Sequence, residues 1–171
     1  MKKSLITTTL PPYIDRYIQL AEDTELVDGL LASLTLFDDY LPELERVADK
    51  QYAPGKWTPK DIIQHITDNE RIMAYRALRI ARSDKTALPG YDEELLANNT
   101  NANNRTMVDI LIEFKVVRQS NIILYHTFKE EMLLRSALCN DIEITPLAIG
   151  FVLIGHQVHH LNILKERYFT L

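Results

Sequence analysis

The chain has 171 residues, a formal net charge of −5 and a single cysteine. Its length suits one domain, residues 1–171, with a substantial buried core. The acidic balance argues against a nucleic-acid-binding surface, which is normally basic. Because Cys139 has no partner, no intramolecular disulfide is possible, which is compatible with a reducing compartment.

The N-terminal segment shows no clear targeting signal. Residues 1–14 contain two lysines but no sustained apolar run before Pro11 and Pro12, so they do not resemble a signal peptide. No stretch approaches the ~20 apolar residues of a membrane span. We therefore expect a cytoplasmic protein that binds neither membranes nor nucleic acid.

The first predicted helix covers residues 24–41, where apolar side chains recur at steps of three and four. The members of this stripe are Leu26, Leu30, Leu34, Phe37 and Leu41. Pro42 ends or restarts the helix, and a short continuation follows. The second predicted helix covers residues 58–82, since Thr58 is a good N-cap and Pro59 suits the first helical position.

The third predicted helix covers about residues 105–137, on the helical spacing of Phe114, Val117, Asn121, Leu124 and Phe128. The fourth begins at Thr145 and Pro146, in the same way as the second, and runs to about Phe169. No credible strand pattern occurs between them. Four long helices predict an all-α four-helix bundle.

The connections predict how the helices are ordered. The connections at about 48–57 and 138–144 are short enough to join antiparallel neighbours. The connection over residues 83–104 is long enough to carry the chain back along a whole helix. The second and third helices would then be parallel, in an up-down-down-up order. The long connection holds five asparagines between Asn98 and Asn104, which favour a solvated loop that caps the third helix. A lid over a site is the alternative.

Three histidines in the fourth helix suggest a metal site. On a helical wheel, His156 and His160 straddle the middle of the apolar stripe, and His159 lies at its edge. An i,i+4 pair lies one helical turn apart and can close on one metal ion. Gly150 and Gly155 would allow a neighbouring helix to approach closely.

A third ligand is needed, because zinc normally takes at least three protein ligands. His65 lies on the apolar side of the second helix, roughly 10 Å from its start, and His160 lies roughly 14 Å from the end of its own helix. His126 is less well placed. We predict one divalent metal ion per chain, bound by His65, His156 and His160. The alternative is that these are buried structural histidines.

Several enzyme classes are excluded by their motifs. "HQVHH" resembles the zincin motif HExxH, but Gln157 replaces the glutamate that serves as the base. A ferritin-like di-iron centre would need Glu-x-x-His on two helices, and none occurs. The chain also lacks GxSxG and a glycine-rich phosphate loop.

Three segments together resemble the DinB/YfiT-like superfamily. They are "YAPGKWTPKDIIQHITDNERIMAYRALRIAR", "LPGYD" and "GHQVHHLNILKERY", in the expected order within residues 11–171. The resemblance implies an up-down-down-up four-helix bundle. It also implies a divalent metal, often zinc or nickel, on three histidines that correspond to His65, His156 and His160. Many members are dimers, so we expect a homodimer.

Characterised members of this superfamily include enzymes that depend on small thiols such as bacillithiol. Three neutral imidazoles leave a divalent ion an open position, which is typical of catalytic rather than structural sites. The leading hypothesis is therefore an enzyme that transfers a small thiol to an electrophile, or hydrolyses a small substrate. The alternative is a non-catalytic, stress-associated protein that binds metal, ligand or a protein partner.

Polar residues near the predicted site complete the set of candidates. Asp68 is three residues after His65 on nearly the same face, so it is a candidate to orient a ligand or act as a base. Its alternative role is an exposed carboxylate paired with Arg71. Trp57 is predicted to plug the bundle end. Candidates for binding an anionic thiol or substrate carboxylate, or else surface or interhelix charges, are Arg76, Arg105 and Arg118.

Overall fold

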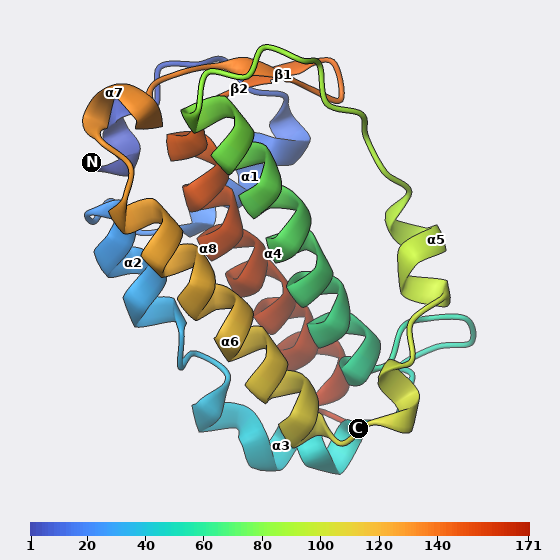
Figure 1. The fold of residues 1–171 in the computed structure, drawn as a ribbon. Helices are drawn as coiled ribbons and strands as arrows, with labels where there is room; N and C mark the ends of the chain where they lie inside the picture. The colour runs from blue at the N-terminus through green and yellow to red at the C-terminus, as the bar shows by residue number, and fades with distance from the viewer.

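A computed structural model describes all of residues 1–171. Helices α2, α4, α6 and α8 form a bundle, and a short hairpin lies near one end of it (Figure 1). The elements are α1 (Pro12–Leu20), α2 (Leu26–Ser33), α3 (Leu41–Val47), α4 (Pro59–Ala81), α5 (Glu93–Asn98), α6 (Met107–His126), α7 (Glu130–Leu133), β1 (Ala137–Cys139), β2 (Ile142–Ile144) and α8 (Pro146–Ile163), which continues as a π-helical turn over Leu164–Tyr168.

The starts of α4 and α8 are set by local sequence, as predicted. The Thr58 hydroxyl accepts a hydrogen bond from the Asp61 N–H at 3.1 Å, and the Asp61 carboxylate accepts one from the Thr58 N–H at 2.9 Å. Thr145 caps α8 by accepting from the Ala148 N–H at 3.1 Å. In both helices a proline follows the cap, where its missing N–H costs nothing.

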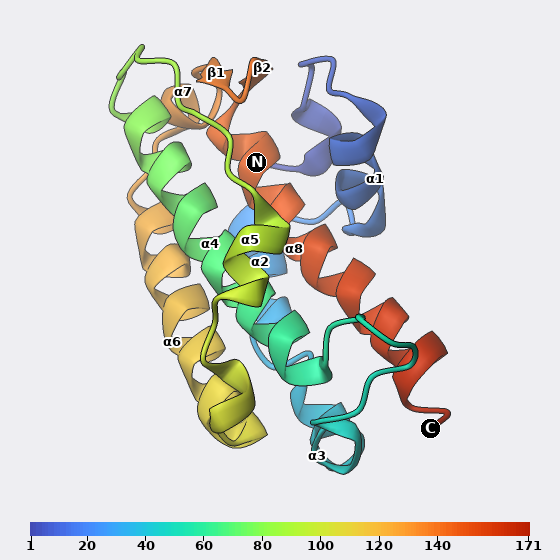
Figure 2. The same ribbon diagram turned by 90° about the vertical axis from the view of Figure 1, so that its right-hand side faces the viewer.

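Side-chain contacts define how the helices run. Gln64 meets Glu113 near the starts of α4 and α6, and Glu70 meets Asn121 further along both, so these two helices are parallel. The segment between them returns along the molecule and carries α5, which lies against α4 (Figures 1 and 2). A long connection is required because α6 begins at the end of the bundle opposite to where α4 ends.

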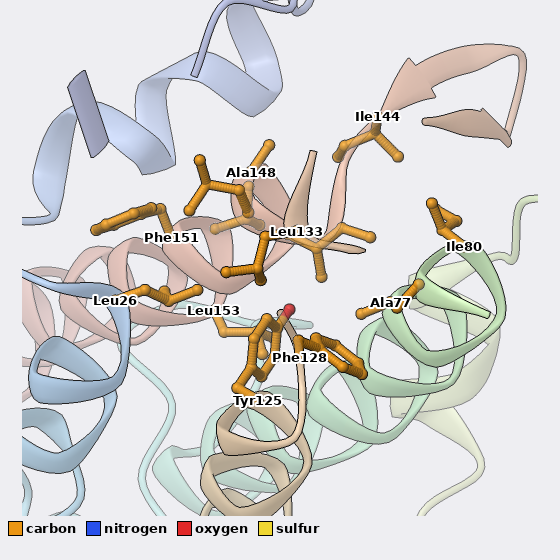
Figure 3. Packing of buried hydrophobic residues seen from close by; sticks show 14 of the residues in the cluster. Leu26, Ala77, Ile80, Tyr125, Phe128, Leu133, Ile144, Ala148, Phe151 and Leu153 are labelled. Carbon is orange, nitrogen blue, oxygen red and sulfur yellow. The ribbon is translucent and has the colours of Figure 1, made fainter. Parts of the chain in front are cut away.

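The bundle core consists of two apolar clusters with a polar layer between them. One cluster surrounds the first half of α8 and includes Leu26, Ile80 and Phe151 (Figure 3). The other surrounds the last turns of α8 and includes Ile63 and Phe114. Along each bundle helix, buried polar side chains lie between the residues of one cluster and those of the other: Ser33, Asn69, Glu70, Arg118, Asn121, His156, Gln157 and His160. The buried His65 lies at the edge of this layer, beside Ile66 of the second cluster.

Half of this polar layer is an ion-pair network that sequence analysis did not predict. Arg118 and Glu70 are both fully buried, and Arg118 Nε donates to Glu70 Oε1 at 2.9 Å. Asn121 donates to the other carboxylate oxygen at 2.7 Å. Arg118 also donates to the Ser33 hydroxyl and to the Leu153 carbonyl. The network therefore joins all four bundle helices.

The first predicted helix was wrong in its extent. Instead of one helix over residues 24–41, α2 ends at Ser33 and α3 starts at Leu41 after a 3₁₀ turn. The Ser33 carbonyl accepts from Gln157 Nε2 at 2.9 Å and from the Leu36 N–H, three residues on, at 3.3 Å. The regular bond from the residue four positions on is absent, so the α-helix ends at Ser33, and Gln157 of α8 satisfies the freed carbonyl.

The third predicted helix was also too long, and the absence of strands was wrong. Helix α6 ends at His126 rather than at about residue 137, and the chain continues through α7 and the antiparallel hairpin β1–β2. Its two-residue turn uses positive φ angles at Asn140 (53°) and Asp141 (61°), residues that tolerate this conformation. Strands of three residues are too short to show a clear alternating pattern. Helix α1 was likewise not predicted.

Helix α8 is more apolar than the sequence analysis recognised. The helix Pro146–Tyr168 has a window of mean hydropathy 1.3, which by length and composition is enough to cross a membrane. In the fold, however, 78% of that window is buried inside the protein, against α1, α2 and α4. A helix enclosed on all sides is expected to be apolar all round, so its central position accounts for its composition.

Candidate metal centre

The structure brings together the three histidines predicted from their spacing. His65 projects from α4, and His156 and His160 project from successive turns of α8. The Nε2 atom of His156 lies 3.2 Å from that of His65 and 3.0 Å from that of His160. All three rings are buried, and their nearest ligand atoms lie within 4.8 Å of one another. We call these residues the three-histidine cluster.

Hydrogen bonds alone cannot satisfy this cluster. The Nε2 atom of His156 faces two other Nε2 atoms, but a neutral imidazole nitrogen carries either one proton or one lone pair. A shared cation accepts all three lone pairs at once. Zinc–nitrogen bonds of about 2.0–2.1 Å in a tetrahedron separate the nitrogens by about 3.3 Å, close to the distances of 3.2 and 3.0 Å from His156 Nε2 to the other two rings. The donor set therefore fits a divalent ion.

Burial keeps these imidazoles neutral. It lowers the pKa of His65 to about 4. It also lowers the pKa values of His156 and His160 well below their ordinary range, and the neighbouring histidines lower them further. Only the neutral form has a lone pair for a metal, so all three side chains are in a ligand-competent state near pH 7.

A hydrogen-bonded chain holds the far side of the His156 ring. The Asn69 amide lies 3.3 Å from His156 Nδ1, and the Tyr91 hydroxyl lies 2.8 Å from the same amide. In the structure the Tyr91 hydroxyl donates to Asn69 Oδ1, and Asn69 Nδ2 faces His156 Nδ1. A metal on Nε2 would put the ring proton on Nδ1, and the amide would then turn over so that its oxygen accepts from Nδ1 and its nitrogen donates to Tyr91. Burial raises the pKa of Tyr91 to about 12, which keeps its hydroxyl neutral.

Aromatic rings enclose the cluster on two sides. The ring of Trp57 lies 4.9 Å from that of His65, measured between centroids, so Trp57 borders the cluster as well as packing at the bundle end. The ring of Tyr17 on α1 lies 5.1 Å from His156 and 5.3 Å from the half-buried His159. His126 is exposed at the end of α6, away from the cluster.

The predicted close approach at the glycines of α8 is confirmed. A Cβ atom on Gly155 would lie 1.7 Å from the backbone oxygen of Tyr17, and one on Gly150 would lie 2.7 Å from Leu26 Cδ1. Gly155 therefore allows α1 to pack directly on α8, which brings Tyr17 to the edge of the His156 ring. The sequence indicated a close helix contact at these glycines but not that α1 and α2 make it.

A cavity of about 260 Å³ opens beside the cluster. It lies between α1, α4, the hairpin and α8, and of the three histidines only His156 lines it. The long connection supplies part of its wall through Gly90 and Tyr91. Whether this segment also acts as a lid stays a prediction. Its asparagines do hold structure, since Asn103 bonds to Thr58 and Asp61.

The remaining polar candidates occupy different surroundings. The Asp68 carboxylate accepts from Gln64 at 3.0 Å and from Arg71 at 3.2 Å, and it lines a separate hollow beside α5. This pairing matches its alternative role, and its role as a base stays a prediction. Arg105 pairs with Glu113. Arg118 is enclosed in the core with Glu70, so it has no free surface for a substrate.

The chain belongs to the DinB superfamily, whose model matches residues 19–164. Its fold is similar to that of YfiT from Bacillus subtilis, with a TM-score of 0.68 and 17% identity over 92% of this chain and 87% of that one. YfiT is described as a probable metal-dependent hydrolase with an unusual four-helix bundle topology. No curated protein is significantly similar to the chain. The predicted family and four-helix bundle are confirmed.

Proposed function

We propose that the protein is a metal-dependent enzyme that uses one divalent ion, zinc or nickel, to transfer a small thiol to an electrophile or to hydrolyse a small substrate. The ion would be held by His65, His156 and His160. The observation that carries this proposal is the convergence of three neutral Nε2 atoms, of which hydrogen bonding can satisfy only part. The likeness to a probable metal-dependent hydrolase supports the same class.

The residues around the cluster define what the protein contributes. A divalent ion acts as a Lewis acid when bound and lowers the pKa of water or of a thiol. Asn69 and Tyr91 orient His156, and the apolar cavity walls exclude water from the substrate. The ligands are neutral, so they leave the whole positive charge of the ion available to a negatively charged nucleophile.

The surroundings of the cluster are compatible with thiol transfer. No carboxylate contacts the three-histidine cluster, and the neutral Tyr91 hydroxyl is a weak base. Water, with a pKa of about 15.7, needs more help to ionise than a thiol, with a pKa of about 8.5. A small thiol therefore suits a site without an adjacent base.

The competing proposal is a non-catalytic protein that binds metal or a ligand. Structural zinc is usually closed by four protein ligands, whereas the potential metal ligands gathered here number three. An incomplete set favours catalysis, because it leaves a position for a substrate or nucleophile.

The test combines metal binding with turnover. Trp57 is the only tryptophan and borders His65, so we expect Ni²⁺ to quench its fluorescence with a stoichiometry of one ion per chain. His160→Ala should abolish the quenching, and His126→Ala is the matched control because His126 is exposed. The metal-loaded protein is then given small thiols with monochlorobimane, and separately a set of esters. Metal-dependent product that disappears in His160→Ala supports the enzyme.

Two results would contradict the proposal in different ways. Undiminished quenching in His160→Ala would show that the ion binds elsewhere. Site-specific metal binding without turnover of any thiol or ester, accompanied by a lower melting temperature on chelation, would favour the binding protein.

A further inference from the structure

Arg76 is a buried cation that no carboxylate neutralises. Its side chain is 8% exposed, it lines the cavity beside the cluster, and it takes part in no ion pair. One guanidinium nitrogen donates to the Pro89 carbonyl at 2.7 Å, and another lies 3.6 Å from the Met73 sulfur. The guanidinium carbon lies 5.7 Å from the centre of the Tyr91 ring. The other buried arginine, Arg118, is paired with Glu70.

Arg76 keeps N–H donors that no protein group uses. A guanidinium has five N–H donors, and the protein contacts of Arg76 use few of them. Nε has no protein partner and is not among the buried polar atoms cut off from solvent, and Arg76 lines the cavity. A buried charge is costly unless it is paired. The site is therefore preorganised for an anion.

The charges at the cavity rim do not cancel Arg76. Arg16, an exposed residue of α1, lines the mouth and bonds to the Tyr17 hydroxyl at 2.6 Å, without a carboxylate partner. Glu93 also lines the cavity from an exposed position, and it forms an ion pair with neither arginine. Two cations and one carboxylate leave the cavity with an excess of positive charge.

The cavity wall between Arg76 and His156 leaves room for the apolar part of a small ligand. Its contact with Met73 shows that the side chain turns back toward the start of α4, which is the usual direction in a helix. Met73 is four residues, or about 6 Å along the axis, beyond Asn69, which contacts His156. The wall between the two positions is apolar and includes Met73, Ile149 and Val152.

We propose that this cavity binds a small monocarboxylate substrate, with its carboxylate on Arg76 and its apolar chain along α8 toward His156, the one cluster histidine that lines the cavity. This inference rests on the proposed function and adds the substrate class. A planar guanidinium binds a carboxylate through two parallel hydrogen bonds. One buried guanidinium balances one negative charge, which favours a carboxylate over a phosphate dianion. The volume of about 260 Å³ limits the ligand to a small molecule.

The binding test needs no turnover. Hexanoate, its uncharged analogue hexanamide, and inorganic phosphate are titrated into the full chain without added metal, and amide shifts are followed by NMR. We expect hexanoate to shift cavity signals and to bind at least tenfold more tightly than hexanamide. Arg76→Gln should weaken hexanoate binding at least tenfold, whereas Arg82→Gln, at an exposed arginine just after α4, should not.

Each alternative result overturns the inference. Equal binding of hexanoate and hexanamide, or unchanged hexanoate binding in Arg76→Gln, would show that Arg76 does not bind a carboxylate. If phosphate binds more tightly than hexanoate and its binding depends on Arg76, the ligand class would be a phosphate rather than a monocarboxylate. Arg76→Lys keeps the charge without the planar fork, so weaker hexanoate binding in this variant supports bidentate recognition even if Arg76→Gln does not fold.

A kinetic comparison separates this inference from the proposed function. For a metal-loaded enzyme offered matched substrates with and without a carboxylate, Arg76→Gln should raise KM for the acidic substrate and leave KM for the neutral one unchanged. Equal effects on both would count against Arg76 as the carboxylate site. Absence of turnover on both would count against the proposed enzyme, while the binding titration would still decide the anion site.

Discussion

The three cluster histidines are all neutral, but His156 and His160 differ in what contacts the second ring nitrogen, Nδ1. His156 Nδ1 contacts Asn69, whereas His160 Nδ1 is sealed from water and has no partner. The polar contact of the His160 ring is therefore made by Nε2, which faces His156. His156 is the only one of the two with an outer hydrogen bond that can fix its tautomer.

This difference makes Asn69 the residue that most directly tunes the proposed metal site. We expect Asn69→Ala to weaken zinc binding about 10–100-fold, the usual effect of losing such a partner, as measured by competition with a chelating dye. Asn69→Asp should preserve affinity, since a carboxylate accepts from Nδ1–H. Asn98→Ala, at an exposed asparagine of α5, is the control. Equal affinity in wild type and Asn69→Ala would show that the amide does not orient the ligand.

At the scale of the elements, α8 meets α1 and α2 through two glycines that differ in what surrounds them. Gly155 faces the backbone of Tyr17, which cannot rotate away, whereas Gly150 faces the side chain of Leu26. Backbone contact leaves α1 no way to accommodate a larger residue except by moving as a whole.

We therefore expect Gly155→Ala to lower the free energy of unfolding by about 1–3 kcal/mol, the usual cost of overpacking. Urea denaturation measures this effect. Gly150→Ala is the matched control and should cost less, because Leu26 can adjust and alanine has the higher helix propensity. Equal stability of the two variants would indicate that α1 is not held at the position described. Gly155→Ala should also weaken metal binding, because Tyr17 lies against His156.

The Glu70–Arg118 pair ties α4 to α6 inside the core. Removing one charge leaves the other buried and unpaired, so Glu70→Gln should lower the free energy of unfolding by about 3–5 kcal/mol. Glu113→Gln is the matched control, since its partners Arg71 and Arg105 are partly exposed, and it should cost less than about 1 kcal/mol. Chemical denaturation of both variants provides the comparison, and similar losses would argue against the buried network.

At the scale of the whole molecule, the homodimer expected from the family resemblance stays a prediction. Exposed apolar side chains share one face of α6, namely Val108, Ile112, Val116 and Ile123. A second copy packed there would remove them from water. We expect light scattering to give twice the 19.8 kDa of one chain, and the double variant Ile112→Glu, Val116→Glu to give that of one chain. A wild-type mass of one chain at all concentrations would contradict the dimer.

The position of the proposed site also follows from the whole bundle. Two apolar clusters fill its ends, and the buried polar side chains between them include ligands of the three-histidine cluster and the Glu70–Arg118 network. Burial by the whole bundle makes the imidazoles neutral. The same burial makes the unpaired Arg76 an anion site, so one physical cause underlies both proposals.

Local chemistry was sufficient to predict part of this protein from its sequence. The Thr-Pro starts of α4 and α8 depend only on a cap and the next turn, and they were predicted correctly. The i,i+4 spacing of His156 and His160 places both rings on one face in any helix, and the apolar stripe shows that this face is buried. His65 was predicted in the same way, because it lies on the apolar side of α4.

Other features depended on partners that are distant in sequence. Helix α2 ends at Ser33, and its last carbonyl is satisfied by Gln157, 124 residues away. Tyr91 reaches Asn69 from a connection whose sequence indicates only a loop. The sequence predicted Arg118 to be an anion-binding residue, a surface charge or an interhelix charge, without naming a partner, and only tertiary packing pairs it with Glu70 and leaves Arg76 unpaired. Periodicity and capping are set by neighbours within one or two turns, whereas desolvation and charge pairing are set by whatever the fold packs against a side chain.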